Sequence, residues 1–368
     1  MWRNRHNFDV PISPTKRAWI VAAALFLLIA AVLVVFYYRQ HGPLTALPGV
    51  TNNPGPPPDI LSQLPADAPV IGYVDAAALR KLQNSPLAAV LGLTSPGPDA
   101  DREYSEFVRD TGFDYTRDLD HAALALWPSS FGAPDNPFGE DRVLAIADGR
   151  FDQQKIEAYA LRTGKIAVHG TQSVYEIPGN PPISMEFLSP TRIVLAGGKN
   201  AADLVAAVTS TGMPARDSAM QSRIKRVAGA PIFALARTDR LPAGFYQNFG
   251  NSPQLEHLAR SIRAITLAGQ PDGNNLKLAL DAECDSMKNA FEISTLLDTF
   301  RMVGSMALYD PKMRGQMTKQ QAAFLAALIN QTKVAHQDKW VRLSLQITPE
   351  MLGGPRTRPA ALVSPAGR

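Results

Sequence analysis

Hydrophobic and polar positions follow three patterns along this chain, and each pattern predicts a different kind of element. Residues 18–38 form one uncharged apolar run. After residue 70, segments in which every second residue is apolar predict strands, and segments with apolar residues three or four apart predict helices. In 276–284, for example, Leu276, Leu278 and Leu280 fall on one side of the predicted strand, and Lys277, Asp281 and Glu283 fall on the other. The patterns predict a transmembrane helix followed by a folded α+β body.

The body is expected to consist of two units that follow one plan. For the first unit (70–229), the pattern predicts strands at 70–75, 122–127 and 143–147, hairpins across 166–177 and 183–196, and helices at 76–91, 104–110, 153–162, 201–208 and 219–227. For the second unit (230–350), it predicts strands at 231–236, 262–268, 276–284 and 340–347, and helices at 254–260, 287–303 and 319–330. The shared order of strand, helix, strand, strand, helix, strand indicates a duplicated α+β unit with mostly antiparallel sheets.

The apolar run at 18–38 is long enough to cross a hydrocarbon core of roughly 30 Å. Four basic residues precede it, namely Arg3, Arg5, Lys16 and Arg17, so the positive-inside rule places residues 1–17 in the cytoplasm and the body outside. A cleaved signal peptide is the alternative, but the run exceeds the usual length of about 7–15 residues and no small-x-small cleavage site follows it. We expect a single-pass inner (plasma) membrane protein that contacts the lipid bilayer through 18–38.

The segments on either side of the body are rich in proline or lack apolar residues. Prolines recur through residues 39–69, which predicts an extended stalk without helix. Residues 351–368 are expected to form a disordered tail. Of the 368 residues, 37 are Lys or Arg and 33 are Asp or Glu, with basic residues gathered before the span and in the tail. The body is therefore close to neutral, and we expect no nucleic-acid partner.

The body opens with Leu64-Pro-Ala-Asp-Ala-Pro69 followed by Tyr73-Val-Asp75, and this opening resembles that of a recurring kind of bacterial membrane-anchored protein. Its members pair one N-terminal span with a duplicated external α+β domain that often opens as LP-x-D-x-P-x-x-x-Y-V-D. The two segments of this chain match that pattern. The resemblance covers most of residues 60–350. It implies the fold and the anchoring, but no activity, and it transfers no catalytic residue.

Motifs for catalysis, metals or cofactors are weak in this chain. The six histidines are far apart and form no ligand-spaced pair, and the single cysteine, Cys284, falls on the apolar side of a predicted strand and is interpreted as a core residue. Ser222-x-x-Lys225 lacks its companion motifs in the order that penicillin-binding enzymes require. Gly197-Gly-Lys-Asn200 is interpreted as a tight turn in which Asn200 caps a helix. The densest polar cluster is Asp118, Asp120 and His121, where a turn enters a strand. We therefore expect no metal and no cofactor.

Two aromatic loops are the more suggestive segments. Residues 127–140 and 241–253 are longer than a tight connection requires. If exposed, their rings would form a partner-binding patch, whereas rings tucked under their own loop would be local packing. The candidate partner contacts are Phe131, Phe138, Phe245, Tyr246 and Phe249.

Three functions are compatible with these patterns. The first is a non-enzymatic binding or assembly module on the extracytoplasmic face, with an envelope protein as its candidate partner. The second is an extracytoplasmic enzyme or small-ligand-binding protein whose site is dispersed along the chain. The third is a signalling receptor, which the short cytoplasmic segment disfavours because 17 residues cannot fold alone.

Overall fold

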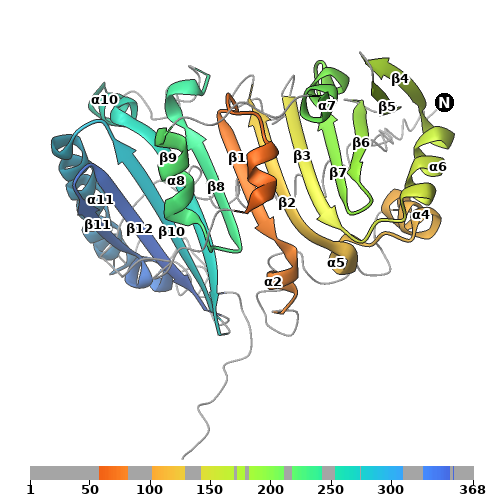
Figure 1. Cartoon of the computed structure of the whole chain (residues 1–368). Coiled ribbons are helices and arrows are strands. Elements are labelled where there is room, and N and C mark those ends of the chain that lie inside the picture. Colours follow the sequence, from red (N-terminus) through yellow and green to blue (C-terminus); the bar gives the residue numbers. More distant parts are fainter. Residues whose placement is uncertain are drawn as a thin grey trace, which may run out of the picture.

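A single antiparallel sheet runs through the whole body (Figure 1). The computed structural model describes residues 58–81, 102–128, 142–169, 172–178, 182–210, 218–242, 253–273, 275–309, 326–348 and 351. In these residues twelve strands pair in the order β11-β12-β10-β9-β8-β1-β2-β3-β7-β6-β5-β4. The predicted α+β class with antiparallel pairing is thereby confirmed. No helix within the described ranges is long and apolar enough to span a bilayer, and the predicted span at 18–38 lies outside those ranges.

The strands divide into two sets that meet in the middle of the sheet. The first set is β1 (Val70–Asp75), β2 (Leu119–Trp127), β3 (Arg142–Gly149), β4 (Lys165–His169), β5 (Gln172–Ile177), β6 (Ile183–Ser189) and β7 (Arg192–Gly197). The second set is β8 (Ile232–Arg237), β9 (Ile262–Asp272), β10 (Asn275–Cys284), β11 (Lys333–Gln337) and β12 (Trp340–Ile347). Strands β1 and β8 pair directly, so backbone hydrogen bonds join the two halves. In each set the third strand pairs with the last one, β3 with β7 and β10 with β12.

Helices cover both faces of the sheet. The face that carries Tyr73 and Leu235, here called face A, packs against η1 (Asp59–Gln63), α7 (Ala201–Ser210) and α8 (Ser218–Val227). The opposite face, face B, packs against α2 (Ala76–Arg80), α6 (Gln153–Thr163) and α11 (Met287–Tyr309). The described residues also form α4 (Arg102–Thr111), α5 (Tyr115–Asp118), η2 (Thr238–Arg240) and α10 (Pro253–Ser261).

The largest core lies on face A and spans both halves of the sheet. Tyr73 and Phe233 sit opposite each other on β1 and β8, and their ring centroids are 5.4 Å apart. Both side chains are at most 4% exposed. Because this contact crosses the junction between the two strand sets, burial of apolar surface holds the halves together.

The segment before β1 departs from the predicted extended stalk. Residues 58–69 belong to the body, because η1 places Ile60 and Leu61 in the face A core and Leu64 follows them there. All three side chains are at most 2% exposed. Burial of these three apolar side chains holds 58–69 against the sheet. The prediction of an extended stalk therefore applies only to the part of 39–69 before residue 58.

Most other predicted elements appear with their bounds shifted by a few residues. The helix expected at 76–91 is described only as α2, because 82–100 lie outside the described ranges, and only the last turn of the helix expected at 319–330 is described. Strand β11 was not predicted from the pattern, and it forms a hairpin with β12 at one end of the sheet. Helix α11 continues to Tyr309, beyond the expected end at 303.

Candidate functional site

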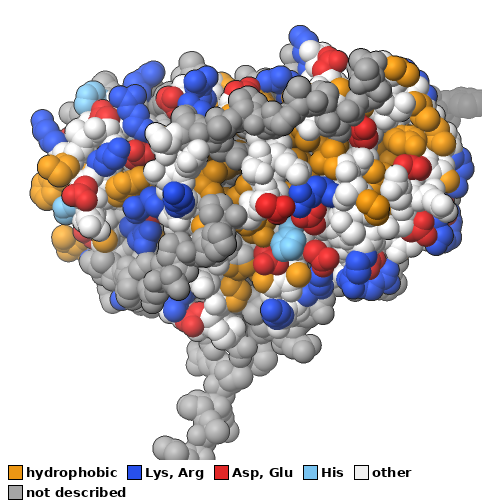
Figure 2. Space-filling view, in the orientation of Figure 1, with side chains coloured by type: hydrophobic (Ala, Val, Ile, Leu, Met, Phe, Trp, Pro, Cys, Tyr) orange, Lys and Arg blue, Asp and Glu red, His pale blue; other side chains and the backbone are white. Residues whose placement is uncertain are grey.

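A row of charged side chains crosses four neighbouring strands on face A. The register pairs Asp75 with His121, His121 with Asp148 and Asp148 with Arg192. Paired residues of antiparallel strands project from the same face, so the four side chains form one line across β1, β2, β3 and β7. We call these four residues the charged row. In Figure 2, acidic side chains surround a histidine on this side of the molecule.

The histidine of the charged row lies between two carboxylates without being tightly bound. Nε2 of His121 is 3.8 Å from an oxygen of Asp75, and Nδ1 is 4.0 Å from an oxygen of Asp148. Both distances exceed a hydrogen bond. The His121 side chain is 39% exposed, so its ring reaches solvent between the two carboxylates.

One end of the charged row is held firmly. Arg192 donates from Nε and Nη2 to the two oxygens of Asp148 at 2.5 and 2.7 Å, and Nη2 also lies 3.3 Å from Asp59 of η1. The hydrogen bond with Asp148 raises the pKa of the Arg192 guanidinium. This bidentate pair fixes Asp148 in place, so His121 is the loosely held member.

The core begins directly beneath the charged row. Tyr73 precedes Asp75 by two residues on the same face, and its ring stacks against that of His121 with a centroid distance of 6.3 Å and an angle of 17°. Burial, followed by the charge of Asp75, raises the pKa of the Tyr73 phenol. The hydroxyl therefore stays protonated at neutral pH, and it is no nucleophile there.

The structure separates the three residues that the sequence groups as one polar cluster. Asp120 points to face B, where it pairs with Arg80 of α2 at 2.5 Å, whereas His121 points to face A. Successive residues of a strand project from opposite faces. Asp118 precedes the strand and accepts from the amide of Asp114 at 3.0 Å. The Asp118 carboxylate is thus bonded to the backbone of its own turn.

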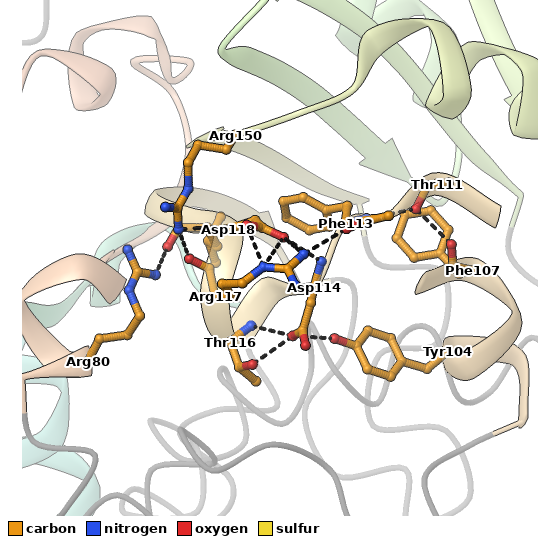
Figure 3. A network of polar contacts seen from close by, with 12 residues as sticks. Arg80, Tyr104, Phe107, Thr111, Phe113, Asp114, Thr116, Arg117, Asp118 and Arg150 are labelled. Carbon is orange, nitrogen blue, oxygen red and sulfur yellow. Dashed lines mark hydrogen bonds and ion pairs between the residues drawn. The ribbon is translucent and has the colours of Figure 1, made fainter. Parts of the chain in front are cut away.

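Asp118 belongs to a structural network that shapes the turn around α5 (Figure 3). Arg117 donates to both Asp118 oxygens, and this bond is the main cause that lowers the pKa of the Asp118 carboxyl. In the same turn Asp114 caps α5 by accepting from Thr116, and it accepts from the Tyr104 hydroxyl at 2.9 Å. Every carboxylate in this network has a local donor, so we assign it to folding.

A second charged cluster lies on face A of the other half, under α8. Asp281 accepts from Arg342 at 2.6 and 2.5 Å and lies 3.3 Å from Arg226. Glu283 accepts from Arg223 at 2.7 Å and from Lys339 at 2.6 Å. The carboxylate side chains are only 4% and 9% exposed. We call these six residues the α8 cluster.

Charge matching explains the α8 cluster. Burial disfavours the ionised form of Glu283, but the bonds from Lys339 and Arg223 outweigh that effect and hold the pKa of this carboxyl below its usual range. Arg226 also lies over the Trp340 ring, 3.9 Å from its centroid. The cluster therefore ties α8 to β10 and β12, and it requires no ligand to be satisfied.

An exposed apolar stripe follows the outer side of α11. Met287, Phe291, Met302 and Met306 are 66%, 56%, 60% and 66% exposed, and their spacing brings them to one side of the helix. The opposite side of the helix packs Ala290 and Ile293 into the face B core. We call the four exposed residues the α11 stripe. An apolar stripe on the outside of a well-packed helix is typical of a contact surface.

The sequence-predicted partner contacts lie outside the described residues. This applies to Phe131, Phe138, Phe245, Tyr246 and Phe249. The connection that carries the first two joins neighbouring strands, since β2 pairs with β3. The α11 stripe was missed because 287–303 was predicted only as a helix, and no side of that helix was assigned to solvent.

The remaining sequence motifs behave as ordinary structure in the described residues. Ser222 and Lys225 are exposed on α8. The turn before α7 has Gly198 at φ 91° and Asn200 at φ 59°, values typical of a tight turn. Cys284 is fully buried, and burial raises the pKa of its thiol to about 11. Within the described ranges no three His, Cys, Asp or Glu side chains form a group suited to a metal ion.

Comparisons with known proteins add only distant structural similarity. No protein-family model matches the chain, and no curated protein matches it. Crystal form IV of the protein TP0453 is similar with a TM-score of 0.44 and 11% identity, over 80% of this chain and 94% of that one. Crystal form III of the same protein gives a TM-score of 0.42 and 10% identity, over 82% of this chain and 96% of that one. A similarity of this degree assigns no function.

Proposed function

We propose that this chain is a membrane-anchored envelope protein whose extracytoplasmic body is a non-enzymatic binding or assembly module. The anchor in this proposal is the apolar run at 18–38, with the N-terminus in the cytoplasm. The body has a large, continuously paired sheet, which is a rigid platform for presenting a surface. Its partner is an envelope protein.

The observation that carries the proposal is the α11 stripe. Large apolar side chains at this exposure lose surface to water only when another molecule covers them. Three of the four are methionines, whose unbranched side chains adapt to the shape of a partner. The α11 stripe therefore supports a protein contact better than it supports catalysis.

Photo-crosslinking in intact membranes tests this proposal. A photoreactive residue at position 302 or 306 of the full chain is expected to give one dominant protein adduct. The matched control is position 277, where Lys277 is 47% exposed on face A. A second variant, Met302→Lys with Met306→Lys, is expected to remove an adduct formed from position 291 while leaving the unfolding transition unchanged. An equal adduct pattern at positions 302 and 277 would contradict the proposal.

The two-unit architecture is part of the same proposal. We infer that the halves descend from one duplicated unit, which is supported by the matching strand order in β1-β2-β3-β7 and β8-β9-β10-β12. An aspartate also pairs with an arginine across the third and last strands of both sets, Asp148 with Arg192 and Asp281 with Arg342. Both pairs project from face A. A two-fold axis perpendicular to the sheet at the β1–β8 junction would relate the two halves and keep equivalent residues on the same face.

The aromatic positions extend the binding proposal to a second surface. Crosslinkers at 131, 138, 245 and 249 test whether these loops contact the same partner. A shared adduct with position 302 would join the two surfaces into one interface. Adducts confined to position 302 would leave the aromatic rings to local packing.

A small-ligand or enzymatic function is the second candidate, and the charged row favours it. His121 is a partly exposed imidazole between Asp75 and Asp148, an arrangement suited to proton exchange with a bound polar molecule. Mass spectrometry of small molecules retained by the native protein and by His121→Ala tests this candidate. A compound that only the native protein retains supports it, and identical retention opposes it.

A further inference from the structure

The two ends of the sheet are built differently. Strand β11 closes one end, where α11 lies beside it on face B and His336 meets Phe291 with ring centroids 5.5 Å apart. Strand β4 closes the other end, at the right of Figure 1. On its outer side β4 pairs with no strand among the described residues. A free strand edge presents amide and carbonyl groups that pair readily with another strand.

The side chains of β4 increase this tendency. Val168 is 74% exposed and Ile166 is 45% exposed. Their register partners are Ser173 and Tyr175, so both project from face B. Leu161, near the end of α6 just before this strand, is 49% exposed as well. Proteins commonly protect an edge strand with a charge that points outward along the edge.

Lys165, the first residue of β4, is 73% exposed, but it projects from face A, opposite to the face that carries Ile166 and Val168. Lys165 pairs with Glu176 of β5 at 3.1 Å, so its ammonium group turns back over the sheet. Just before the strand, the backbone at Gly164 passes close to the backbone of β5. A Cβ on Gly164 would lie only 2.0 Å from the Glu176 carbonyl oxygen. The strand is thus fixed at its beginning, its apolar side chains are exposed, and its outer edge is unpaired within the described ranges.

We propose that β4 pairs antiparallel with β4 of a second copy of this chain, joining two sheets into one across a two-fold axis. Centred on Ala167, this register places Ile166 of each copy opposite Val168 of the other. Four β-branched side chains then meet on one face, the kind of cross-strand pair that stabilises sheets. A pairing about a two-fold axis is self-limiting, since it uses the same edge of both copies.

The sequence of the strand argues for a second copy over an unrelated extended peptide. Ile166 and Val168 of the same strand provide the apolar side chains on both sides of the contact. No other residue of β4 projects from face B, so no apolar side chain there would face a polar one. Pairing with β11 of another copy would instead use two different edges and would build an open chain of molecules. The β4–β4 contact is a closed arrangement, because it uses the same edge of both copies.

Disulfide formation in the full chain tests this pairing. Ala167 lies on the proposed axis, so Ala167→Cys faces itself, and residues opposite each other in an antiparallel pair have Cα separations of about 4.5–5.5 Å, which suits a disulfide. The native Cys284 is fully buried and contributes no background. Mild oxidation in intact membranes is expected to give a homodimer with Ala167→Cys, and Lys277→Cys is the control that gives none.

A second pair of variants makes the test specific to the apolar contact. Val168→Lys in the Ala167→Cys chain is expected to abolish the homodimer, because it places a charge against Ile166 of the other copy. Val168→Thr keeps the branched shape and is expected to retain it. Neither change affects folding, given the exposure of Val168.

Three results would overturn the proposal. The first is an Ala167→Cys thiol that reacts with maleimide but forms no dimer. The second is a dimer that persists unchanged with Val168→Lys. The third is a mixed disulfide with a different protein, which would identify β4 as an edge for an extended partner segment. None of these results depends on the α11 stripe, so the two proposals fail separately.

Discussion

Both halves of the sheet place an aspartate beside an arginine on face A, but the surroundings of the two pairs differ. Asp281 is 4% exposed and contacts two arginines, Arg342 and Arg226. Asp148 is 20% exposed and contacts one arginine and one histidine. In the α8 cluster every carboxylate has two cationic partners at 3.3 Å or less. In the charged row the contacts with His121 are 3.8 and 4.0 Å long.

This difference indicates that the α8 cluster is structural, whereas the charged row has side chains that a ligand can reach. Removing a carboxylate from water is costly, so a buried acid persists only where cations replace its hydration. The α8 cluster meets that requirement in full and has no capacity left for a ligand. The charged row remains partly hydrated, and its imidazole makes no hydrogen bond with either carboxylate. The α8 cluster is therefore expected to contribute more to stability than the charged row, and a polar ligand is expected at the charged row.

Replacing Asp281 is expected to have the largest effect. Asp281→Ala leaves Arg342 without its bidentate partner next to the core, which costs about 3–5 kcal/mol of unfolding free energy for a buried pair. Urea denaturation followed by tryptophan fluorescence measures the change. Asp272→Ala is the control, because Asp272 is 46% exposed in its pair with Lys277 and its loss is expected to cost at most ~0.5 kcal/mol. Equal losses for the two variants would show that the α8 cluster is not structural.

Acid is expected to weaken the α8 cluster through Glu283. Lys339 and Arg223 hold the pKa of this carboxyl below the ordinary 4.5 in the folded state despite its burial. A lowered folded-state pKa contributes stability above the unfolded pKa, and that contribution is lost as the pH falls through the folded value. Glu283→Gln is therefore expected to be less stable than the native protein at pH 7.

The same variant is expected to depend less on pH below about 4.5, where the unfolded carboxyl of the native protein takes up its proton. Unfolding free energies measured between pH 3 and pH 7 (roughly the range over which such carboxyls titrate) compare the two proteins. Parallel pH curves for Glu283→Gln and the native protein would exclude Glu283 as a source of acid sensitivity.

Replacing Asp148 is expected to have a smaller effect than replacing Asp281. Asp148→Ala removes two charge-assisted hydrogen bonds from Arg192, but Arg192 keeps its contact with Asp59. We expect a loss of about 1.5–3 kcal/mol, the range for hydrogen bonds to charged groups. A double-mutant cycle with Arg192→Ala measures the coupling. A coupling as large as that between Asp281 and Arg342 would remove the distinction between the two clusters.

The fold was accessible from sequence because its signals are local. The strand alternation in 276–284 and the helix at 153–162 depend only on residues close in the chain, and β10 and α6 appear where they were expected. Strand β11 was missed because Lys333–Gln337 is short and has few apolar positions. The folded part of 39–69 was missed because proline density outweighed Ile60, Leu61 and Leu64, the three apolar residues that signal packing.

The charged row was not accessible from sequence, because strand register brings it together. Asp75, His121 and Asp148 are separated by long stretches of chain, and only the pairing of β1, β2 and β3 aligns them. Proximity in sequence instead grouped His121 with Asp120, which lies on the opposite face. Alternation within β2 was the one signal in the sequence that could have separated Asp120 from His121, since successive residues of a strand project from opposite faces.

The smallest effect on stability is expected for His121. Its ring makes no hydrogen bond with Asp75 or Asp148 at distances of 3.8 and 4.0 Å, so His121→Ala is expected to change the unfolding free energy by at most ~0.5 kcal/mol. Urea denaturation at pH 7 measures it. A loss comparable to that of Asp148→Ala would mean that the imidazole supports the sheet. An unchanged stability would show that folding does not require a histidine between the two carboxylates.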